Sequence, residues 1–571
     1  MFVRSRRRAV RFGTSGVGLV MLGVAAGSSA LAQPLPPSAD PGRVDQRLVE
    51  PPRPRSTPPL QIEGPEAAPP PAQARAIRFG LTEVRVEGSD RIPEAELAAL
   101  IAPLAGREVT LLEVYELRDA ITARLRGDGF VLSQAIIPAQ RVEGGILRIE
   151  AIEGFISDVA YEGDVSPAVE ALLSAYVARI LAERPLRAST LERQMLLMDD
   201  LPGVGVRSVL RPNDAVKGGT TLVLVAQRRA FGGSVSLDNR GSRAIGPLQA
   251  DVTAEARLLE HKLSVRALTA IPTDELMLGD AAWTSAVGAL GTTVTVGARK
   301  SVSRPGGVAR TNGVHSDTRS VRFAVSHPIL RSSAETIRLT AEVGARHSRT
   351  QNNFGKPAQR LQSEDRLRVL TLTGSWDFAD VWGGSNVLQA TLNKGFGGLG
   401  ASNRGVPRSR ADGEVDFTKL NLYAQRDQPL GGGLSLTLAA EAQLTRDRLL
   451  SSEEYGVGGK SFGLAYDSSE ITGETGGAVR AELSWTTRSD NDAMVAQPFV
   501  YLDAGGANNR DDGSVGSNRR VGWQTLWSAG IGTRLFVGNV SAGLLLAKPF
   551  SDHGAETGRP WRAFFTLSAR F

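Results

Sequence analysis

Cysteine is absent from the 571 residues of this sequence. Its absence excludes disulfide-stabilised scaffolds, thiolate zinc sites and cysteine nucleophiles. Histidine is scarce, and the five histidines lack the spacing of metal ligands: they stand at positions 261, 315, 327, 347 and 553. Long hydrophobic runs are also missing, because no stretch after residue 32 reaches the roughly 18 uncharged apolar residues of a spanning helix. What the chain has in excess is glycine, with 63 residues.

The formal net charge of +6 suggests a basic protein, and it must be judged by where the charges lie. Five arginines stand within the first eleven residues: Arg4, Arg6, Arg7, Arg8 and Arg11. Without them the remaining chain is nearly neutral. We therefore expect no nucleic acid among its partners.

The N-terminus has the pattern of a secretory signal peptide, residues 1–32. The basic start is followed by the apolar stretch Gly16–Gly27 and by Ala30-Leu31-Ala32, a small-x-small cleavage site. A membrane anchor is the weaker alternative because the apolar run is too short. The pattern predicts a protein exported from the cytoplasm.

Residues 33–76 form a proline-rich linker. Thirteen of the chain's 30 prolines lie between Pro34 and Pro71, which favours extended backbone that packs poorly. Only Asp40–Leu48 could form a short helix, with Asp40 as N-cap and Pro41 as the first helical residue. A disordered spacer is the alternative for this segment.

Two small α/β units of the same plan follow, at 77–154 and 155–229. The apolar periodicity predicts strand, helix, helix, strand, strand in each unit. In the first unit the elements are expected at 81–87, 93–102, 111–126, 131–137 and 145–152. In the second unit they are expected at 156–162, 167–181, 189–199, 205–210 and 220–226. Ser189 with Glu192 predicts a capping box at the start of the 189–199 helix. Such repeats are typical interaction modules, because an exposed sheet edge accepts another strand.

From residue 230 to 571 the apolar residues alternate with polar ones, as in Thr336–Arg346, and we count about sixteen such strands. A soluble all-β array or a membrane barrel could produce this pattern. The export signal, the even strand count and the apolar face that ends in Phe565 and Phe571 favour a 16-stranded outer-membrane β-barrel. The predicted fold class is thus membrane all-β, preceded by two small α/β domains.

Nothing in the sequence argues for an enzyme. Gly459-Lys460-Ser461 resembles the end of a phosphate-binding loop, but Glu454 stands where that motif needs glycine. Gly459–Gly463 also fits a hydrolase nucleophile pattern, which requires a strand and a helix that are not predicted here. We expect no catalytic residues, no cofactor and no metal.

A long glycine-rich segment lies between the eleventh and twelfth predicted strands. It runs from Tyr455 to Asp467 and on to Glu474, and it is too apolar for a fully solvated loop. The composition is consistent with a loop that folds back into the barrel or with a disordered surface loop. Two neighbouring patterns accompany it: Asp238-Asn239-Arg240-Gly241 on the first strand and Phe499–Gly505 on the thirteenth.

These features resemble the haemolysin activation/secretion proteins, the outer-membrane transporters of two-partner secretion, over almost the whole chain. The resemblance implies two POTRA domains, a sixteen-stranded barrel and a sixth extracellular loop folded into the pore. It implies pore-loop or gating roles for nine residues: Gly459, Lys460, Phe462, Gly463, Leu464, Tyr466, Asp467, Asp503 and Gly505.

At one position the sequence departs from the family pattern. The superfamily's loop tip carries an arginine that pairs with the strand's aspartate, here Asp503, and Leu464 stands in its place. An unpaired lumenal carboxylate would lose a charge-assisted bond of roughly 1.5–3 kcal/mol. Lys460, Arg480 or another lumenal cation could compensate, or the loop could be held differently. Our hypothesis is that Lys460 compensates.

The resemblance implies export of a large exoprotein that carries an N-terminal secretion domain. Outer-membrane lipid and the barrel assembly machinery are the other expected partners, with Phe565 and Phe571 as a C-terminal assembly signal. The alternatives are an outer-membrane insertion factor, which usually carries more POTRA repeats, and a porin-like channel or adhesin scaffold, which does not need them.

Overall fold

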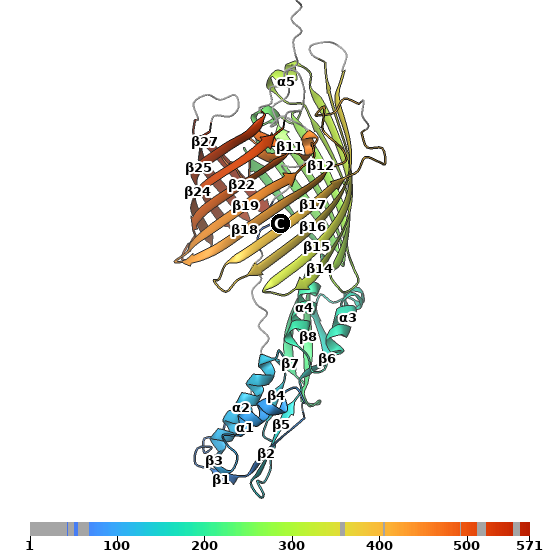
Figure 1. The fold of residues 1–571 in the computed structure, drawn as a ribbon. Coiled ribbons are helices and arrows are strands. Elements are labelled where there is room, and N and C mark those ends of the chain that lie inside the picture. Colours follow the sequence, from blue (N-terminus) through green and yellow to red (C-terminus); the bar gives the residue numbers. More distant parts are fainter. Residues whose placement is uncertain are drawn as a thin grey trace, which may run out of the picture.

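The computed structural model describes residue 43, residues 51–54 and residues 68–571, with gaps at 89, 354–359, 403–405, 492, 511–520 and 552–559. Two α/β units lie in sequence below one end of a large β-barrel (Figure 1). The predicted signal peptide lies outside the described residues. So does the predicted Asp40–Leu48 helix except for Arg43, which stands in a 3-10 turn.

The first unit packs two helices on a three-stranded sheet of order β2-β5-β4. Its core includes Val114 and Ile121 of the longer helix and Ile149 of the central strand, all fully buried. The elements are β1 (Arg78–Leu81), β2 (Glu83–Glu87), α1 (Glu94–Ile101), β3 (Arg107–Thr110), α2 (Leu111–Gly127), β4 (Gln134–Ile136) and β5 (Ile146–Ile152). The small β1–β3 sheet was not predicted, and β4 is shorter than expected.

The second unit repeats this plan with the sheet order β6-β8-β7. Its elements are β6 (Phe155–Gly163), α3 (Pro167–Leu181), α4 (Ala188–Asp199), β7 (Val204–Pro212) and β8 (Gly219–Arg228). The α3 helix begins at Pro167, and the Ser166 hydroxyl accepts a hydrogen bond from Val169 N at 3.3 Å.

The predicted capping box at Ser189 and Glu192 is wrong. The N-cap of α4 is Arg187, and its side chain makes no capping hydrogen bond. Glu192 instead accepts a hydrogen bond from the backbone N–H of Ser333, at 3.0 Å, in a turn of the barrel. A capping box exists elsewhere, at Thr110 and Glu113 of α2, where sequence reasoning did not place one.

The second unit is fixed to the barrel end through the Glu192–Ser333 hydrogen bond, through further polar contacts and through apolar packing. Arg331 forms two hydrogen bonds to the Asp200 carboxylate, at 2.9 and 3.0 Å. The Tyr176 hydroxyl donates to the carbonyl of Gly288 at 3.2 Å, and Ala289 belongs to the second unit's own core. Barrel turns therefore complete the core of this unit.

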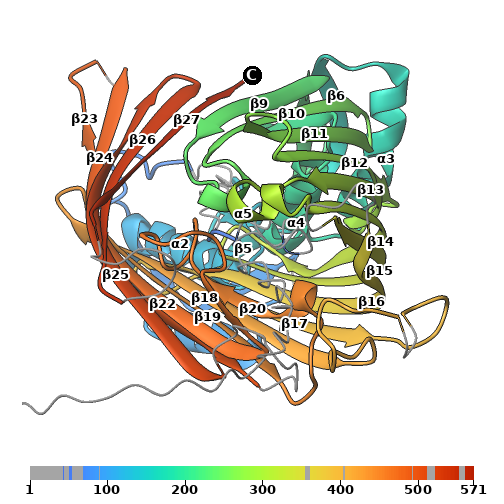
Figure 2. The same ribbon diagram turned by 90° about the horizontal axis from the view of Figure 1, so that it is seen from above.

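The barrel is a closed antiparallel sheet of sixteen strands, seen from above in Figure 2. The two-residue β23 continues β22 along β24, so the two count as one strand. The strands before the long loop are β9 (Phe231–Asp238), β10 (Leu248–Leu258), β11 (His261–Ile271), β12 (Leu276–Val287), β13 (Thr292–Ser303), β14 (His315–Arg331), β15 (Glu335–Asn352), β16 (Arg360–Ala379), β17 (Ser385–Gly395), β18 (Thr418–Gly431) and β19 (Leu434–Thr445). Those after it are β22 (Thr475–Trp485), β23 (Thr487–Arg488), β24 (Met494–Asn509), β25 (Gly522–Val537), β26 (Val540–Pro549) and β27 (Arg562–Arg570). A short helix, α5 (Gly307–Thr311), lies in the loop between β13 and β14.

Closure is made by β27 and β9, whose backbones pair from Thr566–Asp238 to Arg570–Ser234. The chain's last residue takes part, because Phe571 and Gly233 exchange two backbone hydrogen bonds at 2.9 and 3.1 Å. Leu567 and Phe571 are exposed on the outer face. Backbone pairing with β9 therefore continues as far as Phe571.

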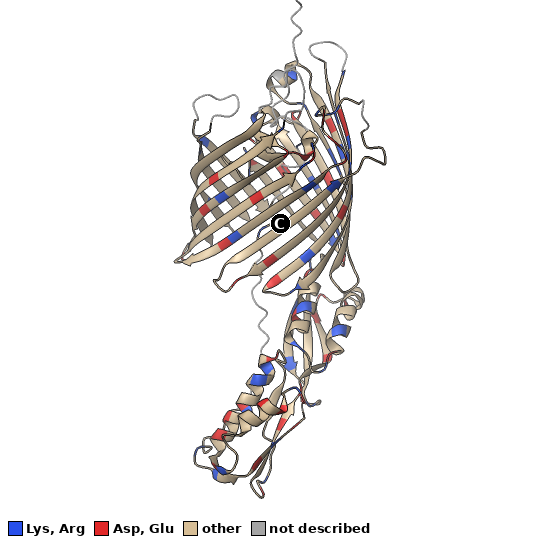
Figure 3. Ribbon diagram, viewed as in Figure 1, with Lys and Arg blue, Asp and Glu red and all other residues tan. Residues whose placement is uncertain are grey.

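Side chains alternate between an apolar outer face and a polar interior, as the sequence pattern predicts. On β15 the outward-facing Leu339 and Val343 are exposed. Charged side chains on other strands form ion pairs on the inner face of the barrel. Arg299 and Arg322 both bind Asp280 at 2.9 Å. Figure 3 shows charges of both signs interspersed over the strands. Within the described residues, no helix is long and apolar enough to cross a membrane.

Candidate functional site: the loop that fills the barrel

The segment between β19 and β22, the eleventh and twelfth strands, folds into the barrel. It contains a 3-10 turn (Ser451–Glu453) and a two-stranded hairpin of β20 (Tyr455–Val457) and β21 (Ile471–Gly473). We name residues 446–474 the pore loop. Its apolar residues share a buried cluster with the barrel wall: Tyr455, Val457, Phe462, Ala465, Tyr466 and Ile471. The disordered alternative is therefore wrong for this loop.

Asp503 of β24 holds the loop tip through backbone groups. Its Oδ2 accepts a hydrogen bond from the backbone N–H of Leu464 at 2.8 Å, and its Oδ1 accepts one from the Ser528 hydroxyl. Asp503 is almost completely buried. Neutral donors thus satisfy the hydrogen-bonding capacity of the Asp503 carboxylate. In the family pattern, an arginine at the position of Leu464 pairs with this carboxylate instead.

Three arginines of the barrel wall bind carbonyl groups of the loop. Arg240 donates to the carbonyls of Leu464 and Gly459, at 2.9 and 2.6 Å, and its guanidinium lies 4.1 Å from the ring centroid of Phe564. Arg480 donates to Ser461 O at 2.8 Å. Arg562 donates to Ala465 O at 2.9 Å and binds the Asp467 carboxylate at 2.5 Å. The cations that hold the tip come from the wall rather than from the loop.

The structure does not support the hypothesis that Lys460 replaces the missing tip arginine at Asp503. Lys460 Nζ lies 2.6 Å from Oδ2 of Asp238, at the end of β9, and its side chain is about half exposed. The physical reason is that Asp503 already accepts hydrogen bonds from Leu464 and Ser528. Lys460 therefore ties the loop to the first strand.

The other predicted loop residues pack or turn at the same place. The Tyr466 hydroxyl accepts hydrogen bonds from the backbone N–H groups of Phe550 and Ser551, at 3.2 and 2.9 Å, and donates to Trp527 O at 3.0 Å. The Phe462 ring is buried, with the Arg480 guanidinium 5.9 Å from its centroid. All nine predicted residues belong to the pore loop or to the strand on which it rests.

Glycine is required at two of these positions. Gly463 has φ +68°, a conformation that costs energy for other residues. At Gly505, on β24, a Cβ would lie 2.6 Å from Cγ1 of Val457, so only glycine lets β20 pass so close to the wall.

A buried charge network lies at the barrel end opposite the α/β units. Glu454 of the pore loop binds two arginines: Arg43 of the N-terminal segment at 3.4 Å and Arg410 of the β17–β18 loop at 2.9 Å. Arg410 also contacts Glu474. These four side chains are at most 1% exposed. Arg43 further donates to the carbonyls of Ser451 and Glu454, at 2.7 and 3.1 Å.

Sequence reasoning did not single out Arg240, Arg410 and Glu474, nor did it assign a role to Arg43. Arg240 lies within the sequence pattern Asp238–Gly241 that accompanies the loop, so this pattern could have indicated that Arg240 lies beside the loop. Arg410 and Glu474 had none, because their contact depends on how two loops meet. In the part of the chain that the structure describes, no cluster of three or more His, Asp or Glu side chains could hold a metal ion.

Two family models match the chain. The model for the POTRA domain, ShlB-type, matches residues 79–154. The model for the haemolysin secretion/activation protein ShlB/FhaC/HecB matches residues 285–535. The first match covers most of the first α/β unit, and the second runs from β12 to β25 and includes the pore loop.

Individual proteins that are similar to this chain in sequence or structure are transporters as well. The outer membrane transporter CdiB of Escherichia coli is 25% identical over 501 residues, which cover 82% of this chain and 79% of that protein. The heme/hemopexin transporter protein HuxB of Haemophilus influenzae is 21% identical over 424 residues, covering 71% and 72%. The structure of CdiB from Escherichia coli superposes with a TM-score of 0.68 at 22% identity, over 90% of this chain and 94% of that one, and has the same fold.

Proposed function

The chain belongs to the haemolysin secretion/activation proteins ShlB/FhaC/HecB, the outer-membrane transporters of two-partner secretion, and on this basis we propose that its barrel is a gated channel, closed at rest by the pore loop. The cargo is one large exoprotein of the haemolysin, haemagglutinin or adhesin class. It crosses from the periplasm to the cell surface. The chain itself carries out transport and no catalysis.

The observation that carries this proposal is the way the loop is held. Arg240, Arg480 and Arg562 bind its backbone carbonyls, and Asp503 binds its backbone N–H groups. Such contacts can be exchanged for contacts with another peptide backbone that enters the same space. An incoming extended chain offers the same carbonyl and N–H groups, so it can displace the loop without leaving the wall arginines unpaired.

The nine predicted gating residues then divide into three kinds. Phe462, Tyr466 and Leu464 fill the lumen, whereas Asp503, Asp467 and Lys460 fix the loop to the wall. Gly459, Gly463 and Gly505 allow the tight turns and close approach that this resting position needs. Loss of a buried group loosens the closed state, whereas the half-exposed Lys460 contributes little.

The N-terminal segment is the second part of the gate. Arg43 lies at the extracellular end of the lumen, whereas residues 51–54 lie beside the periplasmic ends of β15 and β16, against Arg331 and Arg338. The two described parts of the segment, Arg43 and residues 51–54, thus lie at opposite ends of the lumen. The segment must move before an exported chain can pass through the lumen.

Capture of the cargo begins at the POTRA domains. The edge strands are β2 and β4 in the first sheet and β6 and β7 in the second. An unfolded N-terminal secretion domain can add a strand to such an edge through backbone hydrogen bonds. The periplasm holds no ATP, so folding of the cargo outside the cell supplies the direction.

Two further partners follow from the barrel. Outer-membrane lipid covers the apolar outer face, and the barrel assembly machinery inserts the chain, with Phe565 on the last strand and Phe571 directly after it as its recognition signal. In the assembled barrel Phe571 is already paired with Gly233. Recognition would therefore precede closure.

Secretion of the exoprotein encoded beside this chain tests the proposal. A strain that carries the exoprotein alone is compared with strains that add the wild-type chain or a chain with Arg240→Ala. We expect exoprotein in the medium only when the transporter is present. If the exoprotein reaches the medium equally well without this chain, the proposed function is wrong.

A further inference from the structure

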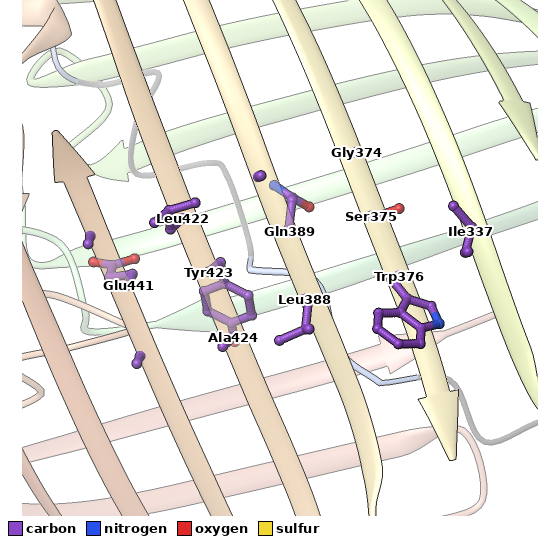
Figure 4. Close-up of a pocket in the computed structure, with 13 residues that line it drawn as sticks. Ile337, Gly374, Ser375, Trp376, Leu388, Gln389, Leu422, Tyr423, Ala424 and Glu441 are labelled. Carbon is purple, nitrogen blue, oxygen red and sulfur yellow. The ribbon is translucent and has the colours of Figure 1, made fainter. Parts of the chain in front are cut away.

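The outer face of the barrel is not evenly covered by large apolar side chains. A hollow of about 590 Å³ crosses the wall from β15 to β19, and Figure 4 shows the residues that line it. Its size is that of a small-molecule site. Other apolar hollows, of about 470 and 710 Å³, lie on the same outer wall, so what marks this one is the residues that line it.

Small residues on neighbouring strands form the floor of this hollow, which we name the wall groove. The register places Gly374 opposite Ala390, and Ala424 opposite Ala440. Ala442 extends the floor along β19. Ile337, Trp376, Leu388 and Leu422 surround it, and the last three are exposed on the outer face. A flexible apolar chain fits such a floor, whereas the wall of a second barrel is convex and would leave the hollow empty.

The periplasmic end of the wall groove is polar. Asn386 and Arg426 are register partners on β17 and β18, on the same face as the floor residues Ala390 and Ala424. Arg426 is paired with Asp380, in the turn between β16 and β17, and donates to Asn386 Oδ1 at 3.1 Å. A carboxylate and a guanidinium thus lie side by side where the apolar surface ends.

The turn that carries Asp380 is held by hydrogen bonds and exposes a tryptophan. The Asp380 carboxylate accepts hydrogen bonds from the backbone N–H groups of Trp382 and Gly384, at 3.0 and 3.2 Å. The Trp382 side chain is 75% exposed, with the Arg426 guanidinium 5.8 Å from its ring centroid. Tryptophan at this level is typical of the boundary between lipid tails and headgroups.

We propose that the wall groove binds one phospholipid of the periplasmic leaflet. An acyl chain lies in the groove, and a zwitterionic headgroup lies beside Asp380 and Arg426. The ammonium of the headgroup faces the carboxylate, and its phosphate faces the guanidinium. The groove continues the lipid-facing wall, so the occupant comes from the bilayer that already covers the barrel.

A lipid at this place would support the gate. The same strands carry Tyr423 and Glu441 on their inner face, and Glu441 accepts a hydrogen bond from the Tyr455 hydroxyl of the pore loop at 2.8 Å. A filled groove stiffens the wall against which β20 packs. This consequence rests on the proposed gating function, but lipid binding itself does not.

Native mass spectrometry of the full chain in mild detergent tests the proposal. Phosphatidylethanolamine, phosphatidylcholine and phosphatidylglycerol are added in turn. We expect one retained phosphatidylethanolamine per chain. Ala440→Phe, which fills the groove, should reduce retention at least tenfold, and Asp380→Asn should remove the preference over phosphatidylglycerol. Ala281→Phe is the matched control, because Ala281 is an exposed outward alanine of β12, away from the groove.

Folding of each variant is checked by its heat-dependent mobility on gels, and Ala440→Leu replaces Ala440→Phe if that barrel does not fold. Equal retention by the filled variant and the control would overturn the site. Equal binding of phosphatidylglycerol by the wild type would overturn the zwitterionic headgroup. A dimer that the filling substitution disrupts would assign the groove to a second copy. The exoprotein plays no part in this experiment, so its outcome is independent of the proposed export.

Discussion

At the residue scale, Arg240 connects the first strand to the tip of the pore loop. It donates to two loop carbonyls and stacks on Phe564. Arg240→Lys keeps the charge but loses the planar fork that reaches both carbonyls. Loss of one hydrogen bond to a charged donor costs roughly 1.5–3 kcal/mol, which is a tenfold or larger rise in the open population.

We expect Arg240→Lys to raise the frequency of open events in single-channel recordings in planar bilayers. Arg266→Lys is the matched control, because Arg266 also lies on the barrel and pairs with Asp251, away from the loop. Identical recordings from the two variants would show that Arg240 does not hold the loop.

For Lys460 we expect a much smaller contribution to holding the loop than for Arg240. Its ion pair with Asp238 is half exposed on the lysine side, and pairs of this kind are worth about 0–1 kcal/mol. Lys460→Ala should therefore leave the protease sensitivity of the loop close to that of the wild type, and clearly below that of Arg240→Ala. A loop that becomes as sensitive as in Arg240→Ala would restore Lys460 as the principal tie.

At the scale of single elements, the start of α2 depends on one carboxylate. Hydrogen bonds from the Thr110 backbone N–H, the Arg107 side chain and the Thr110 hydroxyl lower the pKa of Glu113 to about 2. Because the folded pKa lies below the unfolded value of about 4.3, the contribution is present above pH 4.3. It disappears as the pH falls toward 2.

Hydrogen exchange of the full chain, corrected for the intrinsic pH dependence, measures this effect. We expect the first-turn amides of α2 to be better protected in the wild type than in Glu113→Gln at pH 6, with the difference shrinking between pH 4.3 and pH 2. Glu116→Gln, an exposed position on the same helix, is the control. A difference that stays constant with pH would exclude the carboxylate as its cause.

The helices and strands also show which structural features can be predicted from residues that are close in the sequence. The order of both α/β units, the sixteen strands and the position of the pore loop between the eleventh and twelfth strands were predictable, since alternation and helical periodicity depend on near neighbours. The role of Glu192 was not, because its partner Ser333 is 141 residues away. Pairs such as Arg410 with Glu474, in two different loops, leave no periodic signal in a sequence.

At the scale of the whole molecule, the N-terminal segment joins the two ends of the transporter. Arg43 is buried beside the pore loop, and Arg118 of α2 donates to Ala68 O at 2.7 Å, which fastens the segment to the first POTRA domain. Ala68 follows Arg43 by only 25 positions in the sequence. The described ends of this stretch thus contact the pore loop at Arg43 and the first POTRA domain at Ala68.

The absence of cysteine makes this link directly testable. Arg43 Nη2 lies 3.5 Å from the hydroxyl of Ser469 in the pore loop, so cysteines at both positions fall within reach of a short reducible thiol crosslinker. We expect the crosslinked Arg43→Cys/Ser469→Cys chain to stop secretion of the exoprotein, because segment and loop can no longer leave the lumen independently. Reduction should restore export. Each single-cysteine variant treated with the same reagent is the control, and normal export by the crosslinked chain would show that the two parts leave the channel together or stay in place.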